Sequence, residues 1–240
     1  MSSMKGKRFF QPGRAISTVT LTLDRISRED SVGAVKLPIR TLNVGLAMVG
    51  EIRDDETANI AVNAALTGHL LLSTLHTNDA ATSLPRLNDM GVEPFLISST
   101  VNLIMAQRLM RKVCTGSKVE KYYLNKVMIK NLEKKFNLDE VLNVLKKEKI
   151  IKMKATWSSI EFVKTKKCDK CDDGYKGRVG IYEVLAVDDK IRSLITKKAT
   201  SDEINEVAIA EGMISLTQDA FIKAVQGLTT IEEILRVTQE

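Results

Sequence analysis

Two polar side chains follow two short apolar runs of the sequence, and their types suit phosphate chemistry. Glu51 ends LAMVGE (residues 46–51), and His76 follows LLLSTL (residues 70–75). If both runs are parallel strands, their carboxyl ends meet at one sheet edge, where α/β folds bind ligands. There a carboxylate can hold Mg²⁺ through water or orient an attacking water. An imidazole at the same edge can donate a hydrogen bond to a γ-phosphate oxygen.

Each of these residues also has an ordinary structural interpretation. A glutamate after a strand is common, and a lone histidine is more often a surface or capping residue. The placement of both residues at the ends of successive strands is what favours a shared site. We expect His69, at the helix-to-strand turn in TGHLL, to be structural.

Three cysteines form a second candidate site. Cys168 and Cys171 have C-x-x-C spacing, and Cys114 is the third cysteine of the chain. Three cysteines cannot all pair with one another, and in a reducing compartment this spacing suggests a metal more than a disulfide. The alternative is a packed turn with free thiols.

Composition is that of a folded protein with one sizeable core or two modest ones. Charged residues make up 28% of the 240 residues and hydrophobic residues 44%, which excludes a disordered chain. No run approaches the roughly 18–20 apolar residues needed to span a bilayer. The start, MSSMKGKRFF, lacks the apolar core of a signal peptide, so we expect a cytoplasmic protein.

Positive charge is concentrated in one segment. Residues 112–171 contain 16 Lys and 7 Asp or Glu, a net charge of +9, whereas the whole chain carries +6. Such a segment could contact nucleic acid or an anionic membrane surface, or could be a solvated helix surface. Aromatic residues are sparse between these lysines, so we expect no nucleic-acid partner.

The spacing of apolar residues predicts an α/β domain with a parallel sheet over residues 46–113. LAMVG predicts a strand buried on both faces, and HLLLSTL a second buried strand. Between them, residues 56–69 predict a helix capped by Asp54 or Asp55 and ended by Gly68. A further element starts at Asn78 or Asp79 and stops at Gly91. The residues expected on one face of the first helix are Ile60, Ala61, Ala64 and Ala65.

Pro94 is expected to begin a long helix, because a proline is tolerated in the first turn. The apolar residues that keep helical spacing along it are Ile97, Val101, Ile104, Met105 and Leu109.

The remaining segments divide into three parts. Residues 1–45 carry no motif and are left unassigned, although Ser17 to Leu23 alternates like a strand. Residues 114–175 form a lysine-rich insert with one amphipathic helix, NLDEVLNVLKKEK, and one strand, IEFVKTK. Residues 176–240 form a small, mostly helical C-terminal domain after the extended segment GYKGRVGIYEVLAV. Helix starts with capping-box spacing are Thr200 with Glu203 and Thr230 with Glu233, and the expected stops are Gly212 and Gly227.

A longer stretch resembles a known family. MVGEIRD, LSTLHTNDA and AQRL occur in the order and spacing of the Walker B segment, histidine box and AQRL helix of type II secretion protein E, a family that includes type IV pilus assembly ATPases. GYKGRVGIYEVL and EGMISLTQDAFIKAVQGLTTIEEILRVT resemble the C-terminal part of its pilus-assembly branch. The resemblance covers roughly residues 48–114 and 167–239.

The resemblance implies a RecA-like P-loop NTPase core that uses ATP with Mg²⁺. It implies a homo-hexamer at the cytoplasmic face of a bacterial inner membrane, peripheral and not spanning it, that turns a platform protein and so assembles pilin or pseudopilin. By position, Glu51 is the catalytic carboxylate, His76 belongs to the histidine box, and Arg53 has a supporting role; Glu51 and His76 also contact the nucleotide. The role of Arg108 in AQRL stays open, between a surface and an inter-subunit contact.

Two departures from the family matter. No segment of the 240 residues fits the phosphate-binding loop G-x-x-x-x-G-K-[ST], so we expect a truncated chain with weak or no ATPase activity alone. The family's zinc insert has two C-x-x-C pairs, but here the first reads Cys114-Thr-Gly-Ser117. Cys114, Cys168 and Cys171 could still bind Zn²⁺ with water, Asp169 or Asp172 as the fourth ligand. The alternative function is a non-catalytic module that assembles with the motor or platform without hydrolysing ATP.

Overall fold

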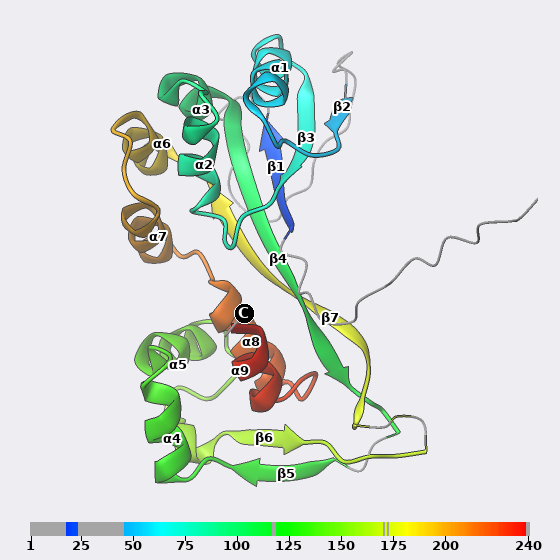
Figure 1. Ribbon diagram of the computed structural model, residues 1–240. Helices are drawn as coiled ribbons and strands as arrows, with labels where there is room; N and C mark the ends of the chain where they lie inside the picture. The colour runs from blue at the N-terminus through cyan, green and yellow to red at the C-terminus, as the bar shows by residue number, and fades with distance from the viewer. Residues whose placement is uncertain (1–17, 24–45, 117–118, 170, 172, 239–240) are drawn as a thin grey trace, which may run out of the picture.

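The computed structural model describes residues 18–23, 46–116, 119–169, 171 and 173–238. Figure 1 shows two lobes joined by a long two-stranded ribbon of β4 (Val101–Val113) and β7 (Tyr175–Ala186). Each lobe has its own cluster of buried apolar residues. The ribbon passes through both clusters, with Ile104 and Leu185 in the upper lobe and Met110 and Ile181 in the lower one.

The upper lobe is built on a mixed sheet with strand order β2-β3-β1-β4-β7. Its remaining strands are β1 (Thr18–Leu23), β2 (Leu46–Val49) and β3 (Leu70–Leu75). β1 confirms the strand expected from Ser17 to Leu23. The expected parallel sheet is wrong except for the β2–β3 pair, because β1 lies between β3 and β4 and runs antiparallel to both.

β2 is an edge strand of the described sheet and not a strand buried on both faces. Leu46 and Met48 are 61% and 76% exposed, so the expectation of double burial is wrong here. An edge position leaves one side of a strand without a hydrogen-bonded neighbour in the sheet. In β3, by contrast, every second residue is buried, as expected for an inner strand.

Another expectation that fails is the long helix from Pro94. Pro94 does begin a helix, α3, but it ends at Thr100, and residues 101–113 form β4. The AQRL segment therefore lies in a strand. Over this length, the spacing of the apolar residues suits either a helix or a strand. Hydrogen bonding to neighbouring strands decides for the strand, because β4 pairs with β1 along one edge and with β7 along the other.

The first helix of the upper lobe, α1, begins and ends where short-range signals place it. In α1 (Asp55–Leu66), Asp54 accepts the Thr57 N–H at 2.8 Å as N-cap, and Gly68 follows the C-cap at φ 88°. Of the residues expected on one face, Ala61 and Ala65 are buried, whereas Ile60 is 58% exposed; the face that packs in the core is completed by Ala58 and Val62. The other helices around this core are α2 (Ser83–Asp89), α6 (Asp189–Thr196) and α7 (Ser201–Ala210).

The lower lobe packs helices against a hairpin (Figure 1). The hairpin strands β5 (Glu120–Tyr123) and β6 (Glu161–Lys164) are antiparallel, and η1 (Trp157–Ser159) precedes β6. The helices are α4 (Lys126–Glu133), α5 (Leu138–Lys147), α8 (Leu216–Val225) and α9 (Ile231–Thr238). The amphipathic helix and the strand expected in the insert are confirmed as α5 and β6. The four helices after β7 are divided between the two lobes: α6 and α7 pack in the upper core, and α8 and α9 pack in the lower core.

Two of the helix starts differ in how their capping boxes form. The Thr200–Glu203 box of α7 is complete, as expected. At α9, Thr230 Oγ1 accepts the Glu233 N–H at 3.3 Å, but the Glu233 carboxylate binds Arg111 and Arg236 instead of closing the box.

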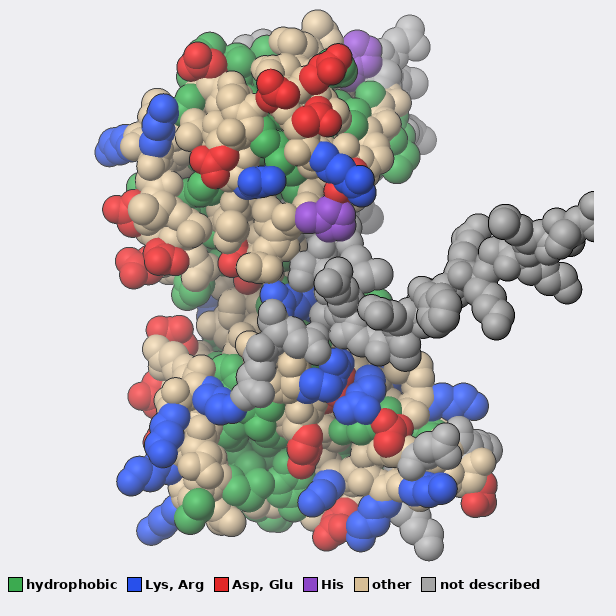
Figure 2. Space-filling model, in the orientation of Figure 1, with side chains coloured by type: hydrophobic (Ala, Val, Ile, Leu, Met, Phe, Trp, Pro, Cys, Tyr) green, Lys and Arg blue, Asp and Glu red, His purple; other side chains and the backbone are tan. Residues whose placement is uncertain are grey.

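No helix in the described part of the chain is long and apolar enough to cross a membrane. Figure 2 shows Lys and Arg side chains spread over one face of the lower lobe, with Asp and Glu between them. Two ion pairs join residues on and beside the hairpin strands, Lys121 with Glu161 and Lys166 with Glu120, both at 2.8 Å. This face resembles a solvated mixed surface more than a continuous basic groove.

Candidate functional site

The structure brings Glu51, Arg53 and His76 together at the carboxyl ends of β2 and β3. His76 Nε2 lies 2.9 Å from Glu51 Oε1, and an Arg53 guanidinium nitrogen lies 2.6 Å from Glu51 Oε2. The two strands are parallel and in register, with Val49 opposite Ser73. Parallel register explains why two residues far apart in sequence reach the same edge.

The segment after β2 is anchored to β3 by two hydrogen bonds. The Ile52 N–H donates to the Thr74 carbonyl at 2.9 Å, and Thr74 Oγ1 donates to the Gly50 carbonyl at 2.8 Å. Ile52 is buried in the upper core, only 2% exposed. With both neighbours of Glu51 tied down, its side chain is directed toward His76.

Glu51 is held as a carboxylate. The hydrogen bond from Arg53 lowers the pKa of Glu51, although partial burial acts in the opposite direction, and the nearby His76 contributes a smaller lowering. The His76 ring is close to Glu51 Oε1 but is not aligned for a hydrogen bond, so this buried oxygen accepts none from the described residues.

The loop that carries His76 is braced internally. Thr77 Oγ1 and Ser83 Oγ lie 2.9 Å apart, and Asp79 Oδ1 accepts the Thr82 N–H at 2.7 Å. The expectation that Asn78 or Asp79 caps this element is wrong, because α2 begins at Ser83 with Thr82 as N-cap, and Asp79 instead holds the turn before the helix. At the far end of β3, His69 Nδ1 lies 3.0 Å from Thr67 Oγ1 beside the C-terminus of α1, away from the His76 site.

Two charged residues that the sequence left without a role also contact this loop. Glu183 on β7 accepts the Ala80 N–H at 2.9 Å. Arg108 on β4 donates to the Asn78 carbonyl at 3.4 Å and to the Val237 carbonyl, at the end of α9, at 2.9 Å. Arg108 therefore binds backbone within its own chain. The signal for Glu183 in the sequence was a single acid in the alternating run IYEVLAV.

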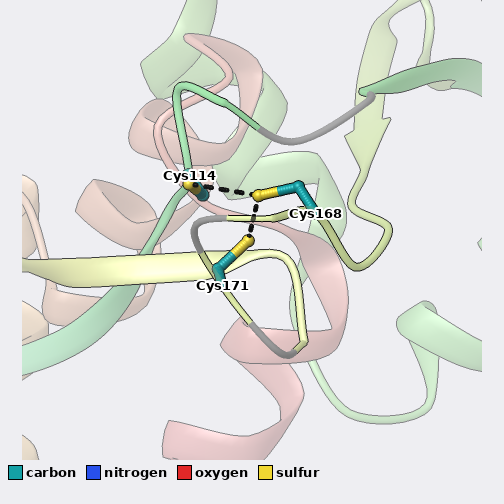
Figure 3. A group of neighbouring side chains, drawn as sticks. All are labelled: Cys114, Cys168 and Cys171. Atoms are coloured by element: carbon teal, nitrogen blue, oxygen red, sulfur yellow. Dashed lines mark hydrogen bonds between the residues drawn. The ribbon is translucent and has the colours of Figure 1, made fainter.

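The three cysteines gather between the lobes' ribbon and the hairpin, as Figure 3 shows. Their sulfur atoms lie within 4.8 Å of one another, with Cys114 buried and the other two half-buried. Cys168 and Cys171 exchange two backbone hydrogen bonds of 3.1 Å, and the Cys114 N–H donates to the Gly174 carbonyl at 2.9 Å. Gly174 has φ 87° and a Cβ there would lie 2.4 Å from the Thr165 Cβ, so a side chain would force the turn apart.

The Cys171 thiol is held in its protonated form. The hydrogen bond with the Cys168 thiol, followed by burial, raises the pKa of Cys171 to about 11. Asp169 is exposed and is not part of the cluster, while Ser117 and Asp172 lie outside the described residues. The described residues thus bring three thiols together, and a structural zinc site uses four ligands.

Comparison with known proteins agrees with this arrangement of motifs. The family model "Type II/IV secretion system protein" matches residues 45–236, a range that contains Glu51, His76 and all three cysteines. This chain belongs to that family. Over 196 residues it is 43% identical to the type IV pilus assembly ATPase PilB of Thermus thermophilus, covering 81% of this chain and 20% of that protein. It is 44% identical over 196 residues to the type II secretion system ATPase E of Vibrio cholerae, covering 81% and 35%.

A solved structure of another ATPase is less similar in sequence. The X-ray structure of the Legionella pneumophila ATPase DotB matches this secretion-family chain with TM-score 0.49 and 22% identity, covering 81% of this chain and 38% of that one. The chain thus spans between 20% and 38% of the length of these three proteins.

Proposed function

We propose that this chain is part of a motor ATPase that couples ATP hydrolysis to the assembly of pilin or pseudopilin subunits at a bacterial inner membrane. The observation that carries the proposal is the contact of the Glu51 carboxylate with both His76 and Arg53 at the end of two parallel strands. The relatives' names, a pilus assembly ATPase and a secretion ATPase, support the same reaction. The motor works as a homo-hexamer, peripheral to the membrane and cytoplasmic, and acts on a platform protein.

In this proposal each residue of the site has a distinct task. Glu51 is ionised and lies beside His76 at the ends of the two strands, which fits a group that orients the attacking water. His76 is 64% exposed on its side chain, so its ring can reach a phosphate oxygen beside Glu51. Arg53 keeps Glu51 charged and oriented. Mg²⁺, when bound with ATP, neutralises the charge of the phosphates; Glu51 is the residue of this site that would hold it, through water.

The phosphates need a further element that the 240 residues do not contain. Their sequence has no match to G-x-x-x-x-G-K-[ST], whose backbone N–H groups and lysine surround the phosphates. We therefore expect these residues alone to hydrolyse ATP weakly or not at all. Efficient hydrolysis should need their combination with such a loop.

The test is a chimera. Residues 45–236 replace the matching segment of the Thermus thermophilus PilB, and ATP hydrolysis is measured on the assembled protein. Glu51→Gln should lower kcat by about 10²-fold or more, because an amide neither accepts a proton nor orients water as a carboxylate does. The matched control is Glu56→Gln, an exposed acid one turn further along.

Two results would contradict the proposal. One is hydrolysis by the chimera that survives Glu51→Gln, and the other is a correctly assembled chimera that does not hydrolyse ATP. The first result would mean that Glu51 is not the catalytic carboxylate. The second would favour the non-catalytic module, which assembles with the motor or platform without hydrolysing ATP.

The thiol cluster is proposed to hold a structural Zn²⁺ through Cys114, Cys168 and Cys171. Sulfurs of a tetrahedral site with Zn–S bonds of about 2.3 Å lie about 3.8 Å apart. Cys114 and Cys168 are at that separation, 3.8 Å, while Cys168 and Cys171 are closer, at 2.6 Å, and would have to separate. The site is incomplete by one thiolate, because Ser117 stands where a second C-x-x-C pair would end.

Zinc affinity should therefore depend on both ends of the cluster. Ser117→Cys is expected to tighten Zn²⁺ binding at least about tenfold, and Cys171→Ser to weaken it by a similar factor, since each changes the number of thiolate ligands. The measurement is competition with a chromophoric chelator, with Asp169→Asn as the control. Equal affinity in the wild type and both cysteine variants would exclude this site.

A further inference from the structure

The ribbon of β4 and β7 carries two charged side chains at the waist between the lobes. On the buried face of β7, Ile181 packs in the lower core and Leu185 in the upper core, and Glu183 lies between them, 4% exposed. Glu183 is opposite Ala106 of β4, and Arg108 is opposite Ile181, so the two charged residues are diagonal neighbours on one face.

The Glu183 carboxylate connects two segments that are distant in sequence. Oε1 accepts the Ala80 N–H at 2.9 Å, and Oε2 accepts the Leu216 N–H at 3.2 Å. Ala80 is in the loop that carries His76, and Leu216 is the first residue of α8. Within the described residues the carboxylate has no ion-pair partner, so these two backbone groups are its principal ligands.

Burial of the Glu183 carboxylate is unfavourable unless it keeps both hydrogen bonds, from the Ala80 N–H and from the Leu216 N–H. Burial raises the pKa of Glu183, while the N–H groups of Ala80 and Leu216 oppose that rise. If a buried carboxylate loses a hydrogen-bond donor, the free-energy cost of removing it from water is no longer offset. The first turn of a helix also stabilises a negative charge, which favours contact with the start of α8. A movement of α8 away from Glu183 should therefore draw the loop with it or break a bond to it.

Arg108, with the opposite charge, also connects the loop that carries His76 to a C-terminal helix. Its guanidinium binds the Asn78 carbonyl in the same loop and the Val237 carbonyl at the end of α9. Each waist residue thus joins one backbone group near His76 to one backbone group of the C-terminal helices.

We propose that Glu183 is a positioning residue that couples the N-terminus of α8 to the His76 loop, so that displacement of α8 changes the position of His76 relative to Glu51. The effect of this coupling on ATP hydrolysis rests on the proposed function, in which His76 is a residue of the nucleotide site. The physical link itself can be measured without nucleotide. Failure of the hydrolysis test and failure of the coupling test are therefore distinguishable.

The test compares two matched helix caps in the full 240-residue chain. Ser215→Ala removes the cap of α8, where Ser215 Oγ accepts the Gln218 N–H at 3.3 Å. Thr200→Ala removes the equivalent cap of α7, where Thr200 Oγ1 accepts the Glu203 N–H, also at 3.3 Å. The measurements are amide hydrogen exchange at Ala80 and the NMR signals of the two histidine rings. The ring of His69 serves as the internal reference.

Ser215→Ala is expected to speed exchange at Ala80 about fivefold and to shift the His76 signal, since a lost cap loosens the first turn of a helix by about that factor. Thr200→Ala should change neither. In a Glu183→Gln background, Ser215→Ala should have no further effect, because an amide has one acceptor oxygen and cannot hold both N–H groups.

Equal effects of the two cap variants on Ala80 would overturn the proposal. So would a Ser215→Ala effect of unchanged size in the Glu183→Gln background. If Glu183→Gln does not fold, as judged by circular dichroism, the comparison of Ser215→Ala with Thr200→Ala still decides.

Discussion

Replacing Glu233 with Ala should lower the free energy of unfolding by about 2–3 kcal/mol. The Glu233 side chain is fully buried in the first turn of α9, and its carboxylate accepts hydrogen bonds from Arg111 Nε at 2.8 Å and from an Arg236 guanidinium nitrogen at 2.7 Å. It also accepts the Arg111 backbone N–H at 2.8 Å. The substitution withdraws the buried negative charge that faces both guanidinium groups and deprives a backbone donor of its acceptor.

Urea unfolding followed by tryptophan fluorescence measures this effect, because the single tryptophan, Trp157, lies in the lower core. The matched control is Glu232→Ala, an exposed acid one residue earlier, which should change the free energy of unfolding by no more than about 0.5 kcal/mol. A loss below about 1 kcal/mol for Glu233→Ala would show that the network contributes little beyond packing.

The same variant should also change how stability depends on pH. Burial acts to raise the pKa of Glu233, but the hydrogen bonds from Arg236 and Arg111 outweigh it, and the net pKa is lowered. A carboxyl with a lowered folded pKa stabilises the fold above its unfolded value of about 4.3 and loses that contribution as pH falls through the folded pKa. The difference between wild type and Glu233→Ala should thus be full near neutral pH and shrink in acid.

Replacing Phe221 with Ala should lower the free energy of unfolding by about 3–5 kcal/mol. Phe221 is fully buried, and its ring meets Phe136 edge-on at 5.5 Å and Trp157 edge-on at 5.6 Å between ring centroids. The alanine would leave a cavity that three elements, α8, η1 and the turn before α5, cannot all close.

Phe95→Ala is the matched control, because the same atoms are removed from a side chain that is 59% exposed. Its effect on the free energy of unfolding should stay within about 1 kcal/mol. Equal losses for the two variants would mean that the lower core repacks around the missing ring, and the aromatic cluster would not be the centre of this lobe.

Short-range signals in the sequence were reliable because their physics is local. Asp54 caps α1 with an N–H three residues away, and Gly68 takes the positive φ that ends the same helix. The candidate site was also predictable, since Glu51 and His76 each follow an apolar run and parallel strands bring such ends together. Arg53 was placed only through the family resemblance, and the structure puts it on the Glu51 carboxylate.

What the sequence by itself determined is the pair of polar residues, Glu51 and His76, that meet at the candidate site, and local signals such as the caps of α1 and α7. Only the tertiary structure decided that residues 101–113 form a strand, because its backbone bonds go to β1 and β7, far away along the chain. It alone also revealed the place of Glu183, whose two hydrogen-bond donors are 103 and 33 residues distant. Periodicity describes which side chains share a face, but it does not specify the partner that completes a backbone ladder or a buried charge.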